Sequence, residues 1–312
     1  SSDVCSSDLV FTVDDAQGRI NGLAPGDAGY LAAALERARN GLSPLANLPG
    51  GYDPAALSRS LSFADGDRLA FMLILNDTLD QIRRDGGSMA SVLFGSPENL
   101  TIAALGRGAY SLAWRDGSGA QLEQVMLEIE ATEAPLPLGS ELQGQPEAEL
   151  IDLRGFEATT AVRATIDVFR EAAFNNVVAF YAIGDRQGTI IDPVTGATLR
   201  PGDAGYAASA VANRLPGLEL QVADQATARF ETVLQGGSLL APFLIANASP
   251  EQLFKGDPLL DASVYFPFIA ANADGVDHLR LLADNVFGFE DLRDGGDLDC
   301  NDMIVEMSFA PI

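Results

Sequence analysis

The chain is poor in cysteine, histidine and basic residues. Two of its 312 residues are Cys and one is His, which excludes a disulfide-rich scaffold and a metal centre built from several histidines. Nineteen Lys and Arg stand against 44 Asp and Glu, and the formal net charge is −25. A chain with this charge is repelled by nucleic acid and by anionic membrane surfaces, and it attracts cations.

Long hydrophobic runs and the short motifs of common enzymes are also missing. No stretch approaches the roughly 20 apolar residues of a membrane-spanning helix, so we expect no membrane span. There is no G-x-S-x-G, no HExxH and no phosphate-binding glycine loop. His278 lies in a strand-like run, where a structural role is more common than catalysis. We therefore expect a protein that is not an enzyme, although hydrolysis by an acidic pair stays open.

The first nine residues, SSDVCSSDL, are polar and show no apolar period. Read as codons, they match a common sequencing-library adapter in frame. We interpret Ser1–Leu9 as an artefact and exclude it from the fold. Two consequences follow: Cys300 is the only natural cysteine, and the missing signal peptide says nothing about export.

An internal duplication organises the rest. The stretch PGDAGY occurs at residues 25–30 and 201–206, each time after a short strand-like run and before an alanine-rich, helix-like segment. A second pair of similar stretches is GDRLAFMLILNDTLDQI and GGSLLAPFLIANASPEQL. In each, an apolar run precedes a capping-box pattern, which begins at Thr78 in the first stretch and at Ser249 in the second. Asp27 and Asp203 stand where helix N-caps would be. Two copies are too few for a solenoid, so we predict two related domains.

The predicted fold class is mainly β, with two β-sandwich-like domains that each carry one short α-helix after PGDAGY. We assign residues 10–131 to a degenerate first copy and 149–312 to the second. Residues 132–148, acidic and rich in proline, form the linker. The strand-forming run 149–176 has no counterpart in the first copy. That copy is therefore predicted to be truncated at its N-terminus and to have an open sheet edge.

The tail FGFEDLRDGGDLDCNDMIVEM concentrates acidic residues between two strand-like runs. So many carboxylates in one folded loop repel each other unless a cation neutralises them, and oxygen-only ligands suit calcium. An EF-hand does not fit, because its sixth position would be Asp302 instead of Gly. We predict a loop on a β-hairpin, with six ligands: Glu290, Asp291, Asp297, Asp299, Asn301 and Asp302.

The first copy lacks most of these acids. Aligning Tyr110 with Phe287 places Ala113 and Trp114 where the second copy has Glu290 and Asp291. We therefore predict one calcium site, in the second copy only. A further acidic group, Asp274, Asp277 and Asp284, is explained by turn chemistry, and a second site there stays open.

The end of the chain resembles the domain-of-unknown-function 4114 family. The resemblance is carried by the motif FGFEDL, followed by GGDLDCND, and by YFPFIAANADGVDHLRLL upstream of it. The resemblance is strongest over the last third of the chain and extends over the second copy. It implies a β-rich domain of secreted, adhesin-like bacterial proteins with a calcium site. It implies no established activity.

These observations favour a non-enzymatic, exported calcium-binding module of a bacterial surface or matrix protein, located outside the cell or at its surface. Calcium would order the acidic loop. The alternative is a calcium-dependent adhesin domain that binds a carbohydrate or a peptide, with a surface glycan or protein as partner. Nucleic acid is not expected as a partner.

Overall fold

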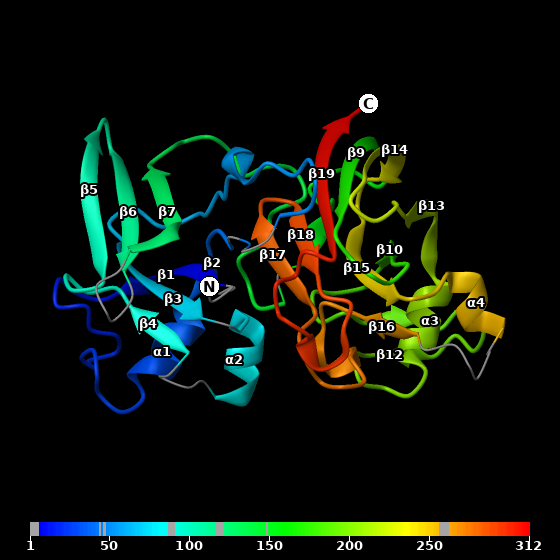
Figure 1. Ribbon diagram of the computed structural model, residues 1–312, viewed down its shortest axis with the longest axis horizontal. Coiled ribbons are helices and arrows are strands. Elements are labelled where there is room, and N and C mark those ends of the chain that lie inside the picture. The colour runs from blue at the N-terminus through cyan, green and yellow to red at the C-terminus, as the bar shows by residue number, and fades with distance from the viewer. Residues whose placement is uncertain are drawn as a thin grey trace.

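The computed structural model describes residues 6–43, 45, 48–75, 77–86, 91–115, 121–147, 149–255 and 262–312. The chain is mainly β, as the sequence predicted. We call residues 6–131 the first half and residues 149–312 the second half; they lie side by side in Figure 1. None of the described helices is long and apolar enough to cross a membrane.

The first half is built on an antiparallel sheet whose strand order is β2-β1-β3-β4. A second sheet has the order β5-β6-β7. Two helices pack on the first sheet, where Phe11 and Met72 contact Ala34, Leu35 and Ile82 in one buried cluster. The elements are β1 (Ser6–Val13), α1 (Tyr30–Arg37), β2 (Arg39–Asn40), a 3-10 turn (Pro54–Ala56), β3 (Arg68–Leu75), α2 (Leu79–Asp85), β4 (Val92–Phe94), β5 (Leu100–Gly106), β6 (Ala109–Arg115) and β7 (Gln121–Glu130).

Part of the adapter-like segment belongs to this sheet. Ser6–Leu9 forms the first half of β1 and pairs in register with β3, from Ser6 opposite Leu75 to Leu9 opposite Met72. Leu9 is buried in the core because it points to the same face as Phe11. Excluding all of Ser1–Leu9 from the fold was therefore wrong for these four residues. Ser1–Cys5 lies outside the described residues, and the adapter origin stays a prediction.

In the second half two sheets pack face to face. One has the order β13-β10-β15-β16, with β8 pairing to β15, and the other the order β14-β9-β19-β18-β17. Their facing side chains, among them Val168, Phe180 and Phe287, form one buried cluster. The elements are β8 (Ile151–Asp152), β9 (Ala161–Arg170), β10 (Val177–Ala182), β11 (Ile190–Ile191), β12 (Thr198–Leu199), α3 (Tyr206–Ala212), β13 (Arg214–Leu220), β14 (Thr227–Gln235), β15 (Leu239–Ala246), α4 (Pro250–Lys255), β16 (Ser263–Tyr265), a 3-10 turn (Ile269–Ala271), β17 (Leu279–Ala283), β18 (Val286–Phe289), a 3-10 turn (Arg293–Gly295) and β19 (Met303–Pro311).

The two halves share a strand order. The order β2-β1-β3-β4 in the first half corresponds, strand by strand, to the order β13-β10-β15-β16 in the second half. In each half a helix, α1 or α3, begins at the tyrosine of PGDAGY. The duplication itself stays a prediction, as does the truncation of the first copy. Among the described residues of the first half, no strand corresponds to β9 or β14. Ile102 and Tyr110 are accordingly 52% and 43% exposed, whereas Leu279 and Phe287 at the corresponding places are buried.

The helix starts differ in part from the prediction. Gly29 and Gly205, both with positive φ, precede α1 and α3. Asp27 and Asp203 instead accept hydrogen bonds from the backbone N of Ala24 and Arg200, so each carboxylate closes the turn before its helix. The predicted caps at Thr78 and Ser249 are confirmed, because each hydroxyl accepts a backbone hydrogen bond from a residue three positions on.

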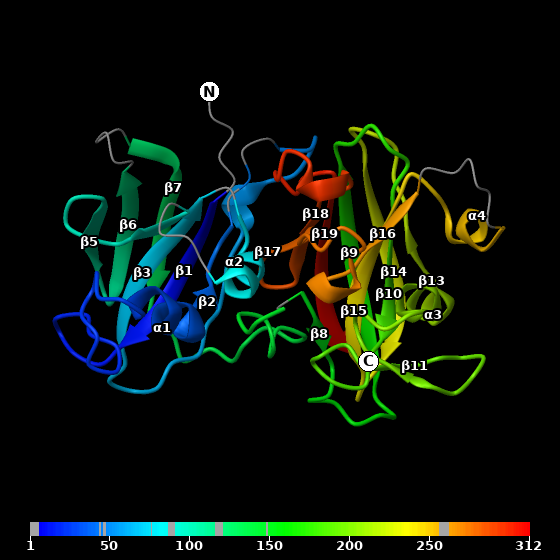
Figure 2. The ribbon, with the colours of Figure 1, turned by 90° about the horizontal axis from the view of Figure 1, so that it is seen from below.

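Specific polar contacts join the halves. The Arg59 guanidinium pairs with Asp284, and both side chains are almost fully buried. Thr78 Oγ1 donates to Asp277 Oδ2 over 2.6 Å. The linker takes part as well, since Gln143 Nε2 donates to Asn285 Oδ1 at 2.9 Å. These contacts place α2 beside the segment that leads into β17 (Figure 2).

Candidate metal centre

The acidic tail forms the loop between β18 and β19. These strands pair antiparallel, and Phe289 opposite Met303 is the pair nearest the loop. The register therefore places Glu290 and Asp302 at the two ends of the loop, directly across from each other. Asp294, Leu298 and Cys300 have φ of 58°, 59° and 53°, so the chain folds back tightly between these ends.

Five of the six predicted ligands are acids, and they fall into two groups that share Glu290. One is Glu290 with Asp291 and Asp302, and the other is Glu290 with Asp297 and Asp299. In each group, one ligand atom per residue lies within 4.8 Å of the others. The described residues of the first half contribute no such group.

Glu290 is the buried centre of the loop. Its Oε1 accepts a hydrogen bond from the Leu292 backbone N at 3.1 Å. Its Oε2 is buried and has no hydrogen-bond partner among the described residues. Burial, followed by repulsion from Asp302, raises the pKa of Glu290 to about 9. An ionised carboxylate that is buried with an unpartnered oxygen is unfavourable unless a positive charge lies beside it.

Asp291 and Asp302 close the loop across the strand ends. The Asp291 backbone N donates to Asp302 Oδ2 at 2.7 Å. Asn176, from the segment before β10, donates to Asp291 Oδ2 at 2.6 Å. Burial and then the Asp291 charge raise the pKa of Asp302 to about 8. Burial also raises the pKa of Asp291.

The second group reaches from the interior to the surface. Asp297 is exposed, while Asp299 is only 8% exposed. Burial, and then the Asp297 charge, raise the pKa of Asp299 to about 6. Asn301 is buried, and its backbone N donates to Asp299 Oδ1 at 3.3 Å. One side of the loop is thus accessible to solvent through Asp297.

A buried histidine supports the loop from outside. His278 is fully buried, and its ring stacks on Tyr265 with 3.5 Å between ring centroids. Its Nε2 lies 2.9 Å from Asp274 Oδ2, and its Nδ1 lies 3.1 Å from the Glu290 carbonyl oxygen. Asp274 Oδ2 also accepts from the Asp294 backbone N. The sequence indicated a structural His278 but no contact with the acidic loop, because the partners come together only in the folded chain.

The further acidic group does not assemble into a site of its own. Asp274 contacts His278, Asp277 accepts from Thr78, and Asp284 pairs with Arg59. Among the described residues, none of the three joins a carboxylate group like those around Glu290. Their roles are to support the loop and to join the halves.

In the first half, Trp114 occupies the position aligned with Asp291. Its indole Nε1 donates to Asp8 Oδ1 at 2.5 Å, and both side chains are buried. Trp114 packs with Leu73, Leu100 and Leu112 in an apolar cluster. Residues 116–120, which align with the acidic loop, lie outside the described residues. The absence of calcium from this copy stays a prediction.

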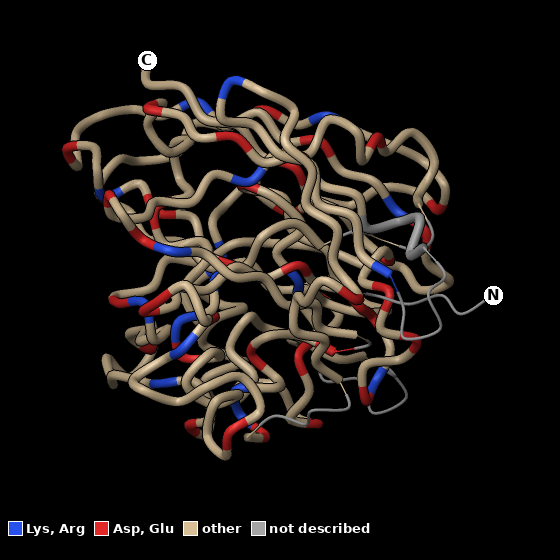
Figure 3. Tube along the Cα trace, turned by 90° about the vertical axis from the view of Figure 1, so that its left-hand side faces the viewer, with Lys and Arg blue, Asp and Glu red and all other residues tan. Residues whose placement is uncertain are grey.

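The donors around Glu290 fit a hard cation. All are oxygens, one is a buried and unpartnered carboxylate oxygen, and burial raises the pKa of four of the carboxyls. Acidic positions occur all along the trace in Figure 3, so charge alone does not mark this site. Among the described residues, the loop is distinguished by the two groups of carboxylates that meet at the buried Glu290.

Comparison with known proteins gives one match. Residues 234–310 match the model of the family described as Domain of unknown function (DUF4114), which confirms the resemblance seen in the sequence. The matched range contains the whole β18–β19 loop. No curated protein and no solved structure matches the chain.

Proposed function

We propose that the C-terminal part of this chain, whose residues 234–310 match the DUF4114 family model, binds calcium through the β18–β19 loop without catalysing a reaction. The observation that carries the proposal is Glu290, whose buried Oε2 has no hydrogen-bond partner among the described residues and which belongs to both carboxylate groups. Glu290, Asp291, Asp297, Asp299 and Asp302 would be the ligands, with Asn301 next to them.

Calcium is favoured over magnesium by the character of the donors. Magnesium requires near-ideal octahedral geometry and keeps several waters, whereas calcium accepts six to eight oxygens in flexible arrangements. A bound calcium ion would neutralise the loop and lock its two strand ends together. The chain itself supplies the scaffold: the β18–β19 pairing, the Asn176 bond to Asp291 and the His278 bond to the Glu290 carbonyl.

We propose an exported module of a bacterial surface or matrix protein as the setting. The acidic charge of the chain and the family resemblance support this setting. Extracellular calcium modules bind with Kd of about 0.1–1 mM. At a hundredfold excess of calcium over Kd, the ion would stabilise the fold by about 2.7 kcal/mol.

A second candidate is a calcium-dependent domain that binds a surface glycan or a protein. It is favoured by Asp297, which is exposed while the other acids of the two groups are buried or half-buried. An ion held partly by Asp297 would keep a coordination position on the solvent side. Glycan and peptide binding measured with calcium and with EDTA would separate this candidate from a purely structural role.

Thermal unfolding of the whole chain in calcium, magnesium and EDTA tests the primary proposal. Calcium should raise Tm more than magnesium does, and Glu290→Gln should abolish the rise. In EDTA the variant should be at least as stable as the wild type, because it buries no acid at this position. The exposed Glu231→Gln of β14 is the control and should keep the full calcium effect. Equal Tm values in calcium and EDTA for the wild type would refute calcium binding.

A further inference from the structure

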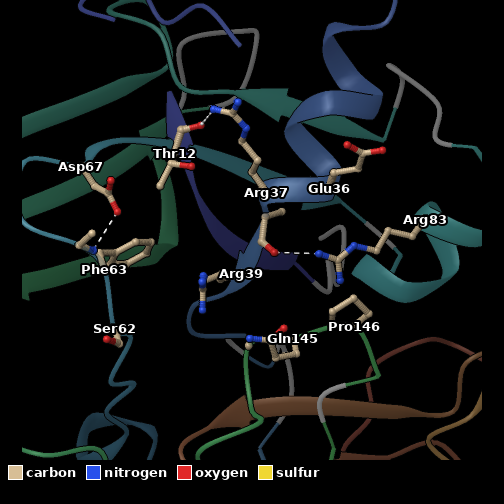
Figure 4. Close-up of a pocket in the computed structure, with 13 residues that line it drawn as sticks. Thr12, Glu36, Arg37, Arg39, Ser62, Phe63, Asp67, Arg83, Gln145 and Pro146 are labelled. Carbon is tan, nitrogen blue, oxygen red and sulfur yellow. Dashed lines mark hydrogen bonds between the residues drawn. The ribbon is translucent and has the colours of Figure 1, made fainter. Parts of the chain in front are cut away.

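A polar pocket of about 390 Å³ lies in the first half, away from the acidic loop. Its wall comes from the end of α1, from β2, from the segment before β3 and from linker residues 144–146. Figure 4 shows Arg37, Arg39 and Arg83 around it. Three guanidinium groups at one pocket are unexpected in a chain with a net charge of −25. The volume suits a small molecule, not a macromolecule.

Two of the three guanidinium groups are already engaged. Arg37 donates to Asp14 Oδ1 at 2.6 Å and to the Thr12 carbonyl oxygen. Arg83 pairs with Asp80 and donates to the carbonyl oxygens of Leu35 and Ala38. These bonds make both side chains rigid parts of the wall.

Arg39 differs from them. Its guanidinium lies 5.6 Å from the centre of the Phe63 ring, and Figure 4 shows it between Phe63 and Gln145. No described carboxylate forms an ion pair with Arg39. Stacking on an aromatic ring orients a guanidinium while leaving its edge N–H groups available, which is the geometry that binds a carboxylate or sulfate.

A second cationic group stands behind this wall. The Arg59 side chain is 2% exposed, and its Nη2 has no hydrogen-bond partner among the described residues. A Cβ placed on Gly144 would lie 2.8 Å from that Nη2 and 3.9 Å from Arg39 Cβ. Gly144 lines the pocket, so Arg59 Nη2 and the base of the Arg39 side chain both lie next to this part of its wall. The Arg59 charge is paired with Asp284, so Arg59 contributes a buried N–H donor behind the wall, whereas Arg39 forms no ion pair with a described carboxylate.

The two acids that line the pocket, Glu36 and Asp67, form no ion pair with Arg39 among the described residues. Asp67 Oδ2 accepts from the Ala64 backbone N at 2.9 Å and thereby closes a turn. Glu36 is exposed on α1, and Figure 4 shows its carboxylate on the side away from Arg39. Ser62 and Gln145, drawn on either side of Arg39, add hydrogen-bonding groups.

We propose that this pocket binds a small polar solute through an oxyanion, a carboxylate or a sulfate, which contacts the Arg39 guanidinium. The Phe63 ring holds Arg39 in place, and Ser62 and Gln145 bind hydroxyl groups of the solute. This site is independent of the acidic loop, so its occupancy does not depend on calcium.

Calorimetric titration of the whole chain in EDTA tests the proposal with three probes: D-glucuronate, D-glucose and inorganic sulfate. Glucuronate should bind saturably, and glucose at least tenfold more weakly. If sulfate binds as tightly as glucuronate, the oxyanion alone is recognised, and if it binds more weakly, the sugar hydroxyls contribute. Both results support an anion site. Equal affinity for glucose and glucuronate, or no saturable binding of either anion, would overturn it.

Variants locate the binding. Arg39→Gln should weaken glucuronate binding at least tenfold, whereas Arg163→Gln, an exposed arginine of β9 in the second half, should leave it unchanged. Phe63→Leu keeps an apolar side chain but removes the ring, and it should also weaken binding. This second variant decides the matter if Arg39→Gln does not fold. Wild-type affinity in a folded Arg39→Gln, or in Phe63→Leu, places the anion elsewhere and refutes the assignment.

Discussion

Thr78 and Asp277 are joined by a 2.6 Å hydrogen bond between the two halves of the chain. The same Thr78 oxygen accepts from the Gln81 backbone N and so caps α2. One hydroxyl therefore both starts a helix and holds the second half against it. Asp277 is buried, so its carboxylate depends on the partners that the interface provides.

Thr78→Val should therefore destabilise the fold by more than the loss of a helix cap alone does. We expect the free energy of unfolding to fall by about 2–3 kcal/mol, since both the cap and a buried bond to a carboxylate are lost. Urea denaturation measures the change. Ser249→Ala is the matched control. The Ser249 hydroxyl caps α4 in the same way, but among the described residues it bonds only to Glu251 and Gln252 of its own segment. Its cost should stay near 1 kcal/mol, and equal costs would contradict the double role of Thr78.

Gly296→Ala should weaken calcium binding. Gly296 has a φ of 50°, and a Cβ there would collide with Glu290 Oε1 and with Leu292 Cβ. The new methyl group would push the central carboxylate out of place. Calcium titration should give a severalfold higher Kd. Gly22→Ala is the control, since Gly22 also has a positive φ but open space around its Cβ position, and it should leave the calcium affinity unchanged.

The stability of the protein should depend on pH in a calcium-sensitive way. Carboxyls with a raised folded-state pKa bind more protons in the folded than in the unfolded state, so stability falls as pH rises. For Asp299, Asp302 and Glu290 this fall extends through pKa values of about 6, 8 and 9.

In EDTA we therefore expect Tm to decrease between pH 6 and pH 9, and calcium should remove the part of the decrease that the loop carboxyls cause. Asp8, Glu147 and Asp277, whose pKa values are raised to about 7, contribute equally with and without calcium. The difference between the Tm values in calcium and in EDTA at each pH therefore reports the contribution of the loop carboxyls. Calcium binding should also release protons at pH 7, which titration in buffers of different ionisation enthalpy measures. Binding without proton release would contradict the raised pKa values.

The Arg59–Asp284 pair between the halves should show strong coupling. Both side chains are at most 5% exposed. Arg59→Met or Asp284→Leu alone leaves a buried charge without its partner and should cost about 3–5 kcal/mol. The double variant removes both charges and should cost much less than the sum. A double-mutant cycle by urea denaturation gives the coupling energy, and additive costs would show that the pair does not act as a unit.

Local sequence signals predicted much of the fold. The capping patterns at Thr78 and Ser249 mark the starts of α2 and α4, because caps are formed by residues close in the chain. The helices after PGDAGY were predicted for the same reason. The exact cap positions were not, because Gly29 and Gly205 supply the positive φ that starts each helix while Asp27 and Asp203 close the preceding turn.

Contacts between distant segments could not be predicted. Asn176 lies 115 positions before Asp291, and no local pattern connects them. The Arg39–Phe63 contact and the position of Gly144 beside Arg59 likewise depend on how the linker lies on the first half. The burial of Leu9 follows from pairing with β3, which lies about sixty residues downstream on the chain.

From its sequence alone, the chain could be predicted to be mainly β, with acids concentrated between two strands near the end and with oxygen as their only donor atom. These properties follow from composition, alternation and short spacings. It is the folded chain that shows Glu290 buried, Asp297 exposed, and both His278 and Asn176 in contact with the loop. The reason is physical: an acid becomes a strong candidate ligand through burial and through partners brought from far along the chain, and both arise only when the sheets pack together.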